Sequence, residues 1–115
     1  MNLLAIDQGT SATKALVVAT EGGTLAEAEV PVHPAAAPGG GVEQDPEELY
    51  RSVVEAGRRA LDAAGEPVAA VGFANQGETV LAWTGPRAGR CRWHCPGRTG
   101  GRRACASAWP AGPTG

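Results

Sequence analysis

The chain has 115 residues, which is the length of one modest domain and too short for two substantial hydrophobic cores. Its net charge is only −2. No apolar stretch is long enough to span a membrane, and the N-terminus lacks the basic-then-apolar layout of a secretory signal. We therefore expect a cytoplasmic protein with no membrane partner.

Charge is distributed unevenly along the chain. All 12 acidic residues lie in 1–84 with four basic residues, whereas residues 85–115 hold six arginines and no acid. The latter segment also lacks Val, Leu, Ile, Met and Phe, and it contains all three cysteines. A segment without branched aliphatic residues cannot build much core. We expect a folded part, 1–84, followed by a disordered Gly/Arg/Pro-rich tail, 85–115.

The N-terminal part predicts strands joined by short turns. Two apolar runs read as strands, and the second of them ends in a β-branched pair. Paired glycines in "TEGGT" supply the positive φ that a hairpin turn needs, and a weaker alternation follows as a third antiparallel strand. The stretch "HPAAAPGGG" reads as a loop, in which we expect His33 to be solvated and without a role. The expected strands are 2–7, 13–19 and 25–32, and the connections are 8–12, 20–24 and 33–41.

A helix is predicted after the loop. Asp45 can cap the first free amides, Pro46 suits the first helical position, and Glu48 completes a capping box. Apolar residues recur at helical spacing up to Ala64, and Gly65 ends the run. Two more strands follow, which gives the order β-β-β-α-β-β. This order predicts an α/β fold with a mixed sheet and the helix on one face. The two later strands are expected at 68–76 and 78–83.

The turn in "LLAIDQGTSATKALVV" carries residues suited to phosphate chemistry. Gly9 would allow a phosphate to approach the backbone, and Thr10 and Ser11 add hydroxyl donors. Lys14 adds a mobile positive charge, and Asp7 could hold Mg²⁺ directly or through water. An ordinary β-turn, with Asp7 bonded to its own backbone, fits the local pattern equally well. The turn alone leaves both interpretations open.

Three motifs together resemble a known family. "IDQGTSATKALVV" resembles the first phosphate loop of the FGGY carbohydrate kinases, "PGGGVEQDPEELY" their loop into a helix, and "VAAVGFANQGET" their strand ending in Asn-Gln-Arg-Glu-Thr. The motifs occur in the family order, and the resemblance covers residues 2–83 nearly continuously. It implies a fragment of an actin-like ATPase (ribonuclease H-like) N-terminal domain, with the mixed sheet in β-β-β-α-β-β order and an irregular C-terminal tail.

The resemblance also implies a reaction and its binding residues. Members transfer a phosphoryl group from ATP, with Mg²⁺, to a hydroxyl of a sugar or polyol. The family's catalytic Asp and its adenosine-binding region lie beyond the part that this chain matches. The resemblance therefore implies that the isolated chain is catalytically inactive. The implied phosphate- and metal-binding residues are Asp7, Gly9, Thr10, Ser11 and Lys14, with Asp7 near Mg²⁺, and the implied substrate-binding residues are Gln76 and Glu78.

Two positions bear on the substrate. The glycerol kinase pattern has Arg where this chain has Gly77, so donors that would hold the substrate hydroxyls are missing, which disfavours glycerol. Lys14 in place of Arg is closer to the xylulokinase-like branch. The expected substrate class is a sugar or polyol, and no oligomeric state is indicated. Acetate and hexose kinases of the same superfamily fit the Asn-Gln-x-Glu strand end less well.

The resemblance stops at Trp83. With GC-rich codons and one G restored after the Trp83 codon, the new frame can read W-D-R-A-T-G-R-P-L-P-L-A-L-S-W-Q-D-G-R-A, which fits the family's next segment. This favours an out-of-frame tail. One alternative function is a small non-enzymatic binding module whose basic tail recruits nucleic acid or protein, although no recognisable nucleic-acid module is present. A zinc site is also disfavoured, because the spacing of its candidate ligands is unusual. Those candidates are Cys91, His94, Cys95 and Cys105.

Overall fold

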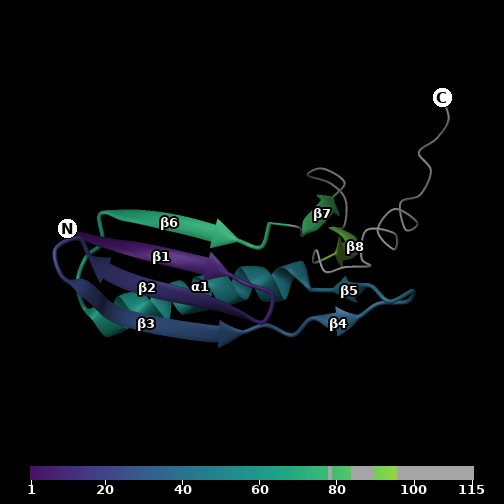
Figure 1. The fold of residues 1–115 in the computed structure, drawn as a ribbon, viewed down its shortest axis with the longest axis horizontal. Helices are drawn as coiled ribbons and strands as arrows, with labels where there is room; N and C mark the ends of the chain where they lie inside the picture. The colour runs from purple at the N-terminus through teal and green to yellow at the C-terminus, as the bar shows by residue number, and fades with distance from the viewer. Residues whose placement is uncertain (78, 84–89, 96–115) are drawn as a thin grey trace, which may run out of the picture. The chain divides into compact units, whose positions relative to one another are not determined.

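The structure, a computed structural model, describes residues 1–77, 79–83 and 90–95 (Figure 1). The chain divides into two compact units. The first contains Met1–His33 and Glu47–Gln76, and the second contains Pro34–Pro46 and the described residues from Gly77 onward. Within the described residues, no helix is both long and apolar enough to cross a membrane.

A four-stranded mixed sheet forms the first unit, as the sequence predicts. The strand order is β3-β2-β1-β6, in which β1, β2 and β3 are antiparallel neighbours and β6 runs parallel to β1 (Figure 1). The third strand begins two residues earlier than predicted, because Gly23, with φ of 82°, already pairs with Ala19. The strands are β1 (Asn2–Gln8), β2 (Ala12–Ala19), β3 (Gly23–Pro31) and β6 (Ala70–Asn75).

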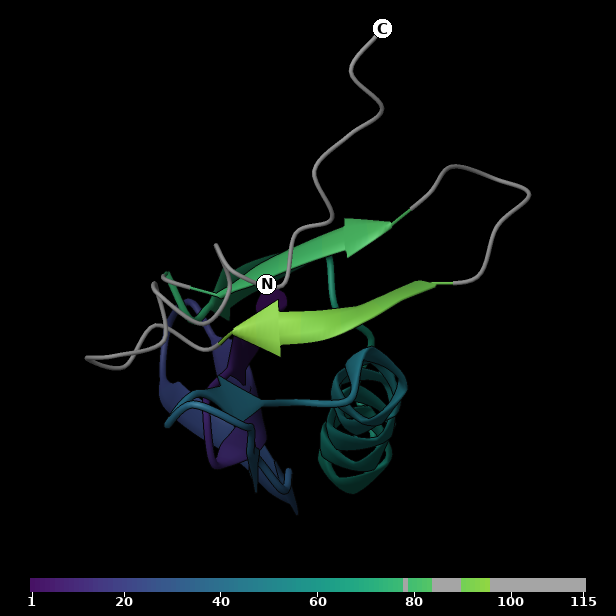
Figure 2. The same ribbon diagram turned by 90° about the vertical axis from the view of Figure 1, so that its right-hand side faces the viewer.

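One helix, α1 (Pro46–Ala64), packs on one face of this sheet (Figure 2). Its predicted start and end are confirmed, and Gly65 follows it with φ of 64°. Small residues on the buried side of α1 let the helix lie close to the strands: a Cβ built at Gly57 would be 3.5 Å from Ile6 Cδ1. The core between helix and sheet contains Leu4, Ile6, Ala15, Val17, Val30, Ala56 and Ala60.

The helix leaves β6 uncovered. Val71 and Phe73 pair with Leu4 and Ile6, so they lie on the helix-facing side of the sheet. Both are nevertheless exposed, at 61% and 58%. The described part of the chain therefore presents apolar surface along its β6 edge, where burial would ordinarily be favourable.

The second unit contains two short hairpins. β4 (Ala35–Ala36) pairs with β5 (Val42–Glu43). β7 (Val80–Trp83) pairs with β8 (Arg90–Cys95). β4 lies inside the predicted loop 33–41, and β8 lies inside the tail where no strand was expected. The remainder of the tail, 84–89 and 96–115, is outside the described residues.

Candidate functional site

The connection between β1 and β2 is a closed, tight turn. The Gly9 backbone N–H donates to the Ala12 carbonyl at 3.0 Å. A Cβ on Gly9 would lie 2.9 Å from the same oxygen, closer than real Cβ atoms approach. The Ser11 carbonyl accepts from Val32 N–H at 2.9 Å, which fixes the turn to the chain just beyond β3. Glycine is thus required at position 9 by the turn itself, a reason different from the phosphate approach expected from the sequence.

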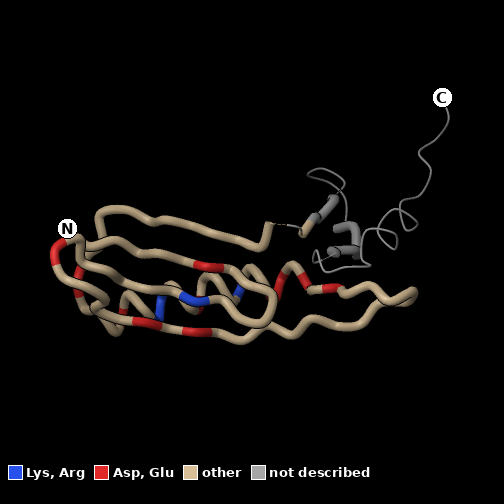
Figure 3. The backbone as a smooth tube through the Cα atoms, viewed as in Figure 1, with Lys and Arg blue, Asp and Glu red and all other residues tan. Residues whose placement is uncertain are grey.

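Asp7 and Lys14 lie opposite each other on the two strands that this turn connects. They are directly opposed in the β1–β2 register, so their Cβ atoms are about 5 Å apart. Both side chains lie on the sheet face away from α1 and are exposed. Lys14 is also opposite Glu29 on β3, and its Nζ lies 3.3 Å from Glu29 Oε2. Figure 3 shows basic and acidic positions together on this sheet, with the basic positions in blue and the acidic ones in red.

The Lys14–Glu29 ion pair does not immobilise the ammonium group. The two side chains are 54% and 51% exposed, and exposed pairs of this kind contribute at most about 1 kcal/mol. Lys14 can therefore exchange its carboxylate partner for another anion at little cost. Thr10 and Ser11 stand in the adjacent turn, with Ser11 exposed and Thr10 half-buried and already engaged in an interaction within the chain.

Gln8, which no sequence motif singled out, is buried beside this turn. Its side chain is 7% exposed, and its Nε2 donates to the Gly9 carbonyl at 2.7 Å. Its position in the strand alternation, in phase with Leu4 and Ile6, could have identified it as a buried amide at a strand end. A buried amide must find partners, and Gln8 finds them at the turn.

Gln76 lies beside the turn. Because β6 is parallel to β1, both strands end at the same edge of the sheet. The Gln76 backbone N–H donates to the Gln8 carbonyl at 3.1 Å, and its Nε2 lies 3.4 Å from Gln8 Oε1. The structure thus brings one of the two predicted substrate-binding residues next to the predicted phosphate turn. The other, Glu78, lies outside the described residues.

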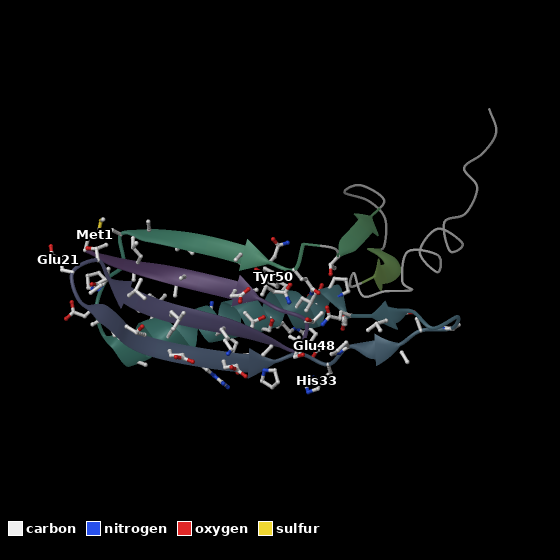
Figure 4. The ribbon with its side chains drawn as sticks, viewed as in Figure 1. Met1, Glu21, His33, Glu48 and Tyr50 are labelled. Carbon is white, nitrogen blue, oxygen red and sulfur yellow. The ribbon has the colours of Figure 1, made fainter. Side chains whose placement is uncertain are left out.

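His33 is solvated, as expected, with its side chain 78% exposed, and it also contacts the first turn of α1. The His33 backbone N–H donates to Glu48 Oε1 at 2.8 Å, and His33 Nδ1 lies 2.7 Å from the same oxygen (Figure 4). The sequence alone indicates no role for His33. The pair joins the chain two residues after the end of β3 to the first turn of α1.

The described residues contain no cluster of three or more His, Cys, Asp or Glu side chains that could hold a metal by itself. Asp7 offers a single exposed carboxylate. This donor set suits Mg²⁺, which is commonly held by one or two carboxylates together with phosphate oxygens and water. The candidate zinc ligands Cys91, His94, Cys95 and Cys105 lie outside the side chains that the structure describes.

Comparison with solved structures defines the class of fold. Xylulose kinase from Lactobacillus acidophilus superposes with a TM-score of 0.69 at 18% identity, over 82% of this chain and 19% of that one. Glycerol kinase from Plasmodium falciparum gives a TM-score of 0.66 at 23% identity, over 83% of this chain and 20% of that one. The mixed sheet with its single helix is therefore part of the actin-like ATPase fold of sugar kinases.

Sequence comparison gives the family. The model of the FGGY family of carbohydrate kinases, N-terminal domain, matches residues 2–86. Glycerol kinase from Methylobacterium nodulans is 48% identical over 86 residues, which is 70% of this chain. The chain belongs to the FGGY family of carbohydrate kinases. It spans 17% of the length of that relative, and the region it matches is the N-terminal domain.

Proposed function

We propose that this chain forms the phosphate-binding part, and a portion of the acceptor-binding part, of a cytoplasmic ATP- and Mg²⁺-dependent sugar or polyol kinase. The observation that supports this most directly is the closed Gly9–Ala12 turn with Asp7 and Lys14 opposed at its foot. Family membership supplies the reaction class.

The residues of the turn have separate tasks in this proposal. Asp7 would hold Mg²⁺, directly or through water, and the metal when bound would neutralise charge on the transferred phosphoryl group. Gly9 keeps the turn closed, and the hydroxyls of Thr10 and Ser11 donate to phosphate oxygens. The Lys14 ammonium group gives up its ion pair with Glu29 and binds the same phosphate oxygens. Phosphoryl transfer depends mainly on positioning and charge neutralisation, so these groups match its requirements.

Gln76 and Glu78 would face the acceptor hydroxyls. Curated relatives are named glycerol kinases, and structural neighbours include xylulose and gluconate kinases. Gly77 stands where the glycerol kinase pattern has Arg, and no atom of the described residues lies within 4 Å of a Cβ built there. No steric clash therefore requires glycine at this position. Glycine in place of Arg removes guanidinium donors from the acceptor site. We propose the substrate class as sugar or polyol.

The isolated chain is proposed to lack turnover, because the family's catalytic Asp lies outside the matched region. In a radiolabel transfer assay with pentoses and polyols, the purified chain should leave ATP intact. Measurable transfer would overturn this part of the proposal. The alternative of a non-enzymatic binding module is not favoured, since the family match covers most of the chain.

A binding experiment tests the phosphate site. Magnesium pyrophosphate is the probe, because the family's adenosine-binding region lies beyond the matched part of the chain. Asp7→Asn removes the carboxylate proposed for Mg²⁺, and the loss of one charge-assisted contact should weaken magnesium pyrophosphate binding roughly tenfold by calorimetry. Asp62→Asn is the matched control, because Asp62 is an exposed carboxylate on α1. A wild-type chain that binds no magnesium pyrophosphate, or an Asp62→Asn effect equal to that of Asp7→Asn, would contradict the proposal.

A further inference from the structure

Gln8 occupies the place where the phosphate turn and the end of β6 meet. Gln8 is the last residue of β1, and its backbone is paired with Thr13 on β2 and with Asn75 on β6. Its side chain is on the helix-facing side of the sheet and only 7% exposed. A polar side chain in that position needs satisfied hydrogen bonds, since an unpaired buried amide is destabilising.

The two ends of the Gln8 amide bind different segments. Nε2 donates to the Gly9 carbonyl at 2.7 Å, inside the turn. Oε1 faces Gln76 Nε2 at 3.4 Å, a long and therefore weak bond, which the backbone bond from Gln76 N–H to the Gln8 carbonyl at 3.1 Å supports. The contact joins residues 68 positions apart in the chain.

The orientation of this amide is determined by its surroundings. Only the NH₂ end can face the Gly9 carbonyl, because an oxygen there would oppose another acceptor. The remaining Oε1 is thereby directed at Gln76. A carboxylate has no donor for Gly9, an aliphatic side chain has neither group, and Asn is one methylene shorter. Glutamine is the side chain that satisfies both partners at this distance.

We propose that Gln8 is a positioning residue that fixes the phosphate turn and Gln76 relative to one another. The inference rests on the proposed function for its consequence, namely that nucleotide phosphate and acceptor are aligned through Gln8. The reacting atoms of phosphoryl transfer must lie nearly in line, so a shared anchor for the two binding segments contributes to alignment. Gln8 acts through Gly9 and Gln76.

The test uses nuclear magnetic resonance on the ¹⁵N-labelled 115-residue chain. Gln8→Met retains the length of the side chain and removes both hydrogen bonds of the side-chain amide. We expect the Gln76 side-chain amide signals to shift and the amides of the Gly9 turn to exchange about tenfold faster with solvent, as the loss of one hydrogen bond predicts. Gln44→Met is the matched control, because Gln44 is another buried glutamine, 4% exposed, in the other compact unit.

A second variant tests the contact from its other end and does not alter the deeply buried residue. Gln76 is half-buried, and Gln76→Met should shift the Gln8 side-chain amide signals while the fold is kept. Gln76 amide signals that are unchanged in Gln8→Met, or Gln8 amide signals that are unchanged in Gln76→Met, would overturn the proposal. So would shifts at these positions of the same size in Gln44→Met.

Magnesium pyrophosphate then separates this inference from the proposed function. In the wild-type chain, magnesium pyrophosphate should shift the amides of residues 9–11 and also the Gln76 side-chain amide. In Gln8→Met the first shift should remain and the second should disappear, whereas an undiminished shift at Gln76 would overturn the inference. If magnesium pyrophosphate moves no signal in the wild-type chain, the proposed phosphate site is wrong, and the positioning role is judged by the ligand-free spectra alone.

Discussion

The hydroxyls of Thr13 and Ser52 lie 2.7 Å apart in the buried interface between β2 and α1. Thr13 is completely buried and Ser52 is 2% exposed, and Ser52 Oγ also donates to the Leu49 carbonyl at 2.7 Å. Because Ser52 Oγ uses its proton on Leu49, Thr13 donates to Ser52. Thr13 pairs with Gln8 across the β1–β2 ladder, so this contact anchors α1 next to the Gly9–Ala12 turn.

Ser52→Ala should therefore destabilise the first unit. The change leaves the Thr13 hydroxyl buried without its acceptor, which costs about 1–3 kcal/mol. Thr13→Val removes that hydroxyl while Ser52 keeps the Leu49 carbonyl, so its cost should be smaller. Urea denaturation of both variants measures the difference in the free energy of unfolding. Thr24→Val, at an exposed residue of β3, is the control. If Thr13→Val lowers the free energy of unfolding more than Ser52→Ala does, Thr13 is not the donor in this hydrogen bond.

Gly9→Ala tests the steric requirement of the turn. The new Cβ would lie 2.9 Å from the Ala12 carbonyl, so either the turn or its Gly9–Ala12 hydrogen bond must shift. We expect a loss of about 1–3 kcal/mol of stability in urea denaturation and weaker magnesium pyrophosphate binding. Gly22→Ala is the matched control, because nothing lies within 4 Å of a Cβ there, and its effect should stay within about 0.5 kcal/mol. Equal effects of the two substitutions would contradict the assignment.

Removal of Glu29 should release Lys14 for phosphate. Glu29→Gln abolishes the competing carboxylate at 3.3 Å, so magnesium pyrophosphate affinity should rise severalfold while stability changes by less than about 1 kcal/mol. Lys14→Met should lower the affinity. Glu27→Gln, which neutralises another exposed acid of β3, is the control for general charge. Calorimetry in low salt measures all three, and an affinity that falls in Glu29→Gln would show that the ion pair supports binding.

The uncovered residues of β6 should promote self-association of the isolated chain. Val71 and Phe73 are 61% and 58% exposed on an edge strand, and exposed apolar edges favour pairing between chains. The double change Val71→Thr, Phe73→Thr keeps β-propensity and should shift the mass measured by light scattering towards the monomer. Tyr50→Gln, at an exposed aromatic residue of α1, is the control. A monomeric wild-type chain at high concentration would refute this expectation.

Local sequence patterns predicted the parts of the fold that depend on neighbouring residues. The alternation in β1 and β2, the Pro46 start of α1 and the Gly65 end are each readable within a few positions, and all were confirmed. Contacts between distant segments were not readable. Gln8 looked like part of a polar turn, because its partner Gln76 becomes adjacent only once β6 pairs with β1. The two-residue strands β4 and β5 are too short to show a period.

The candidate site shows the same division. The sequence selected Asp7 and Lys14 by residue type, and the register places them opposite each other. It did not predict that Lys14 would lie against Glu29, since that pairing depends on where β3 begins. The requirement for Gly9 was assigned to a bound phosphate, whereas the nearest obstacle to a Cβ is the Ala12 carbonyl.

The composition change near Trp83 leads to a prediction about the gene. The family match ends at residue 86, close to the point where acids and branched aliphatic residues cease. If the tail is translated out of frame, sequencing from fresh template should find one further G after the Trp83 codon, followed by a frame that encodes the Trp-Gln-Asp segment. Continuous kinase-like sequence should then extend downstream. A confirmed reading of the present frame, with no such segment in either neighbouring frame, would show that the tail belongs to this protein.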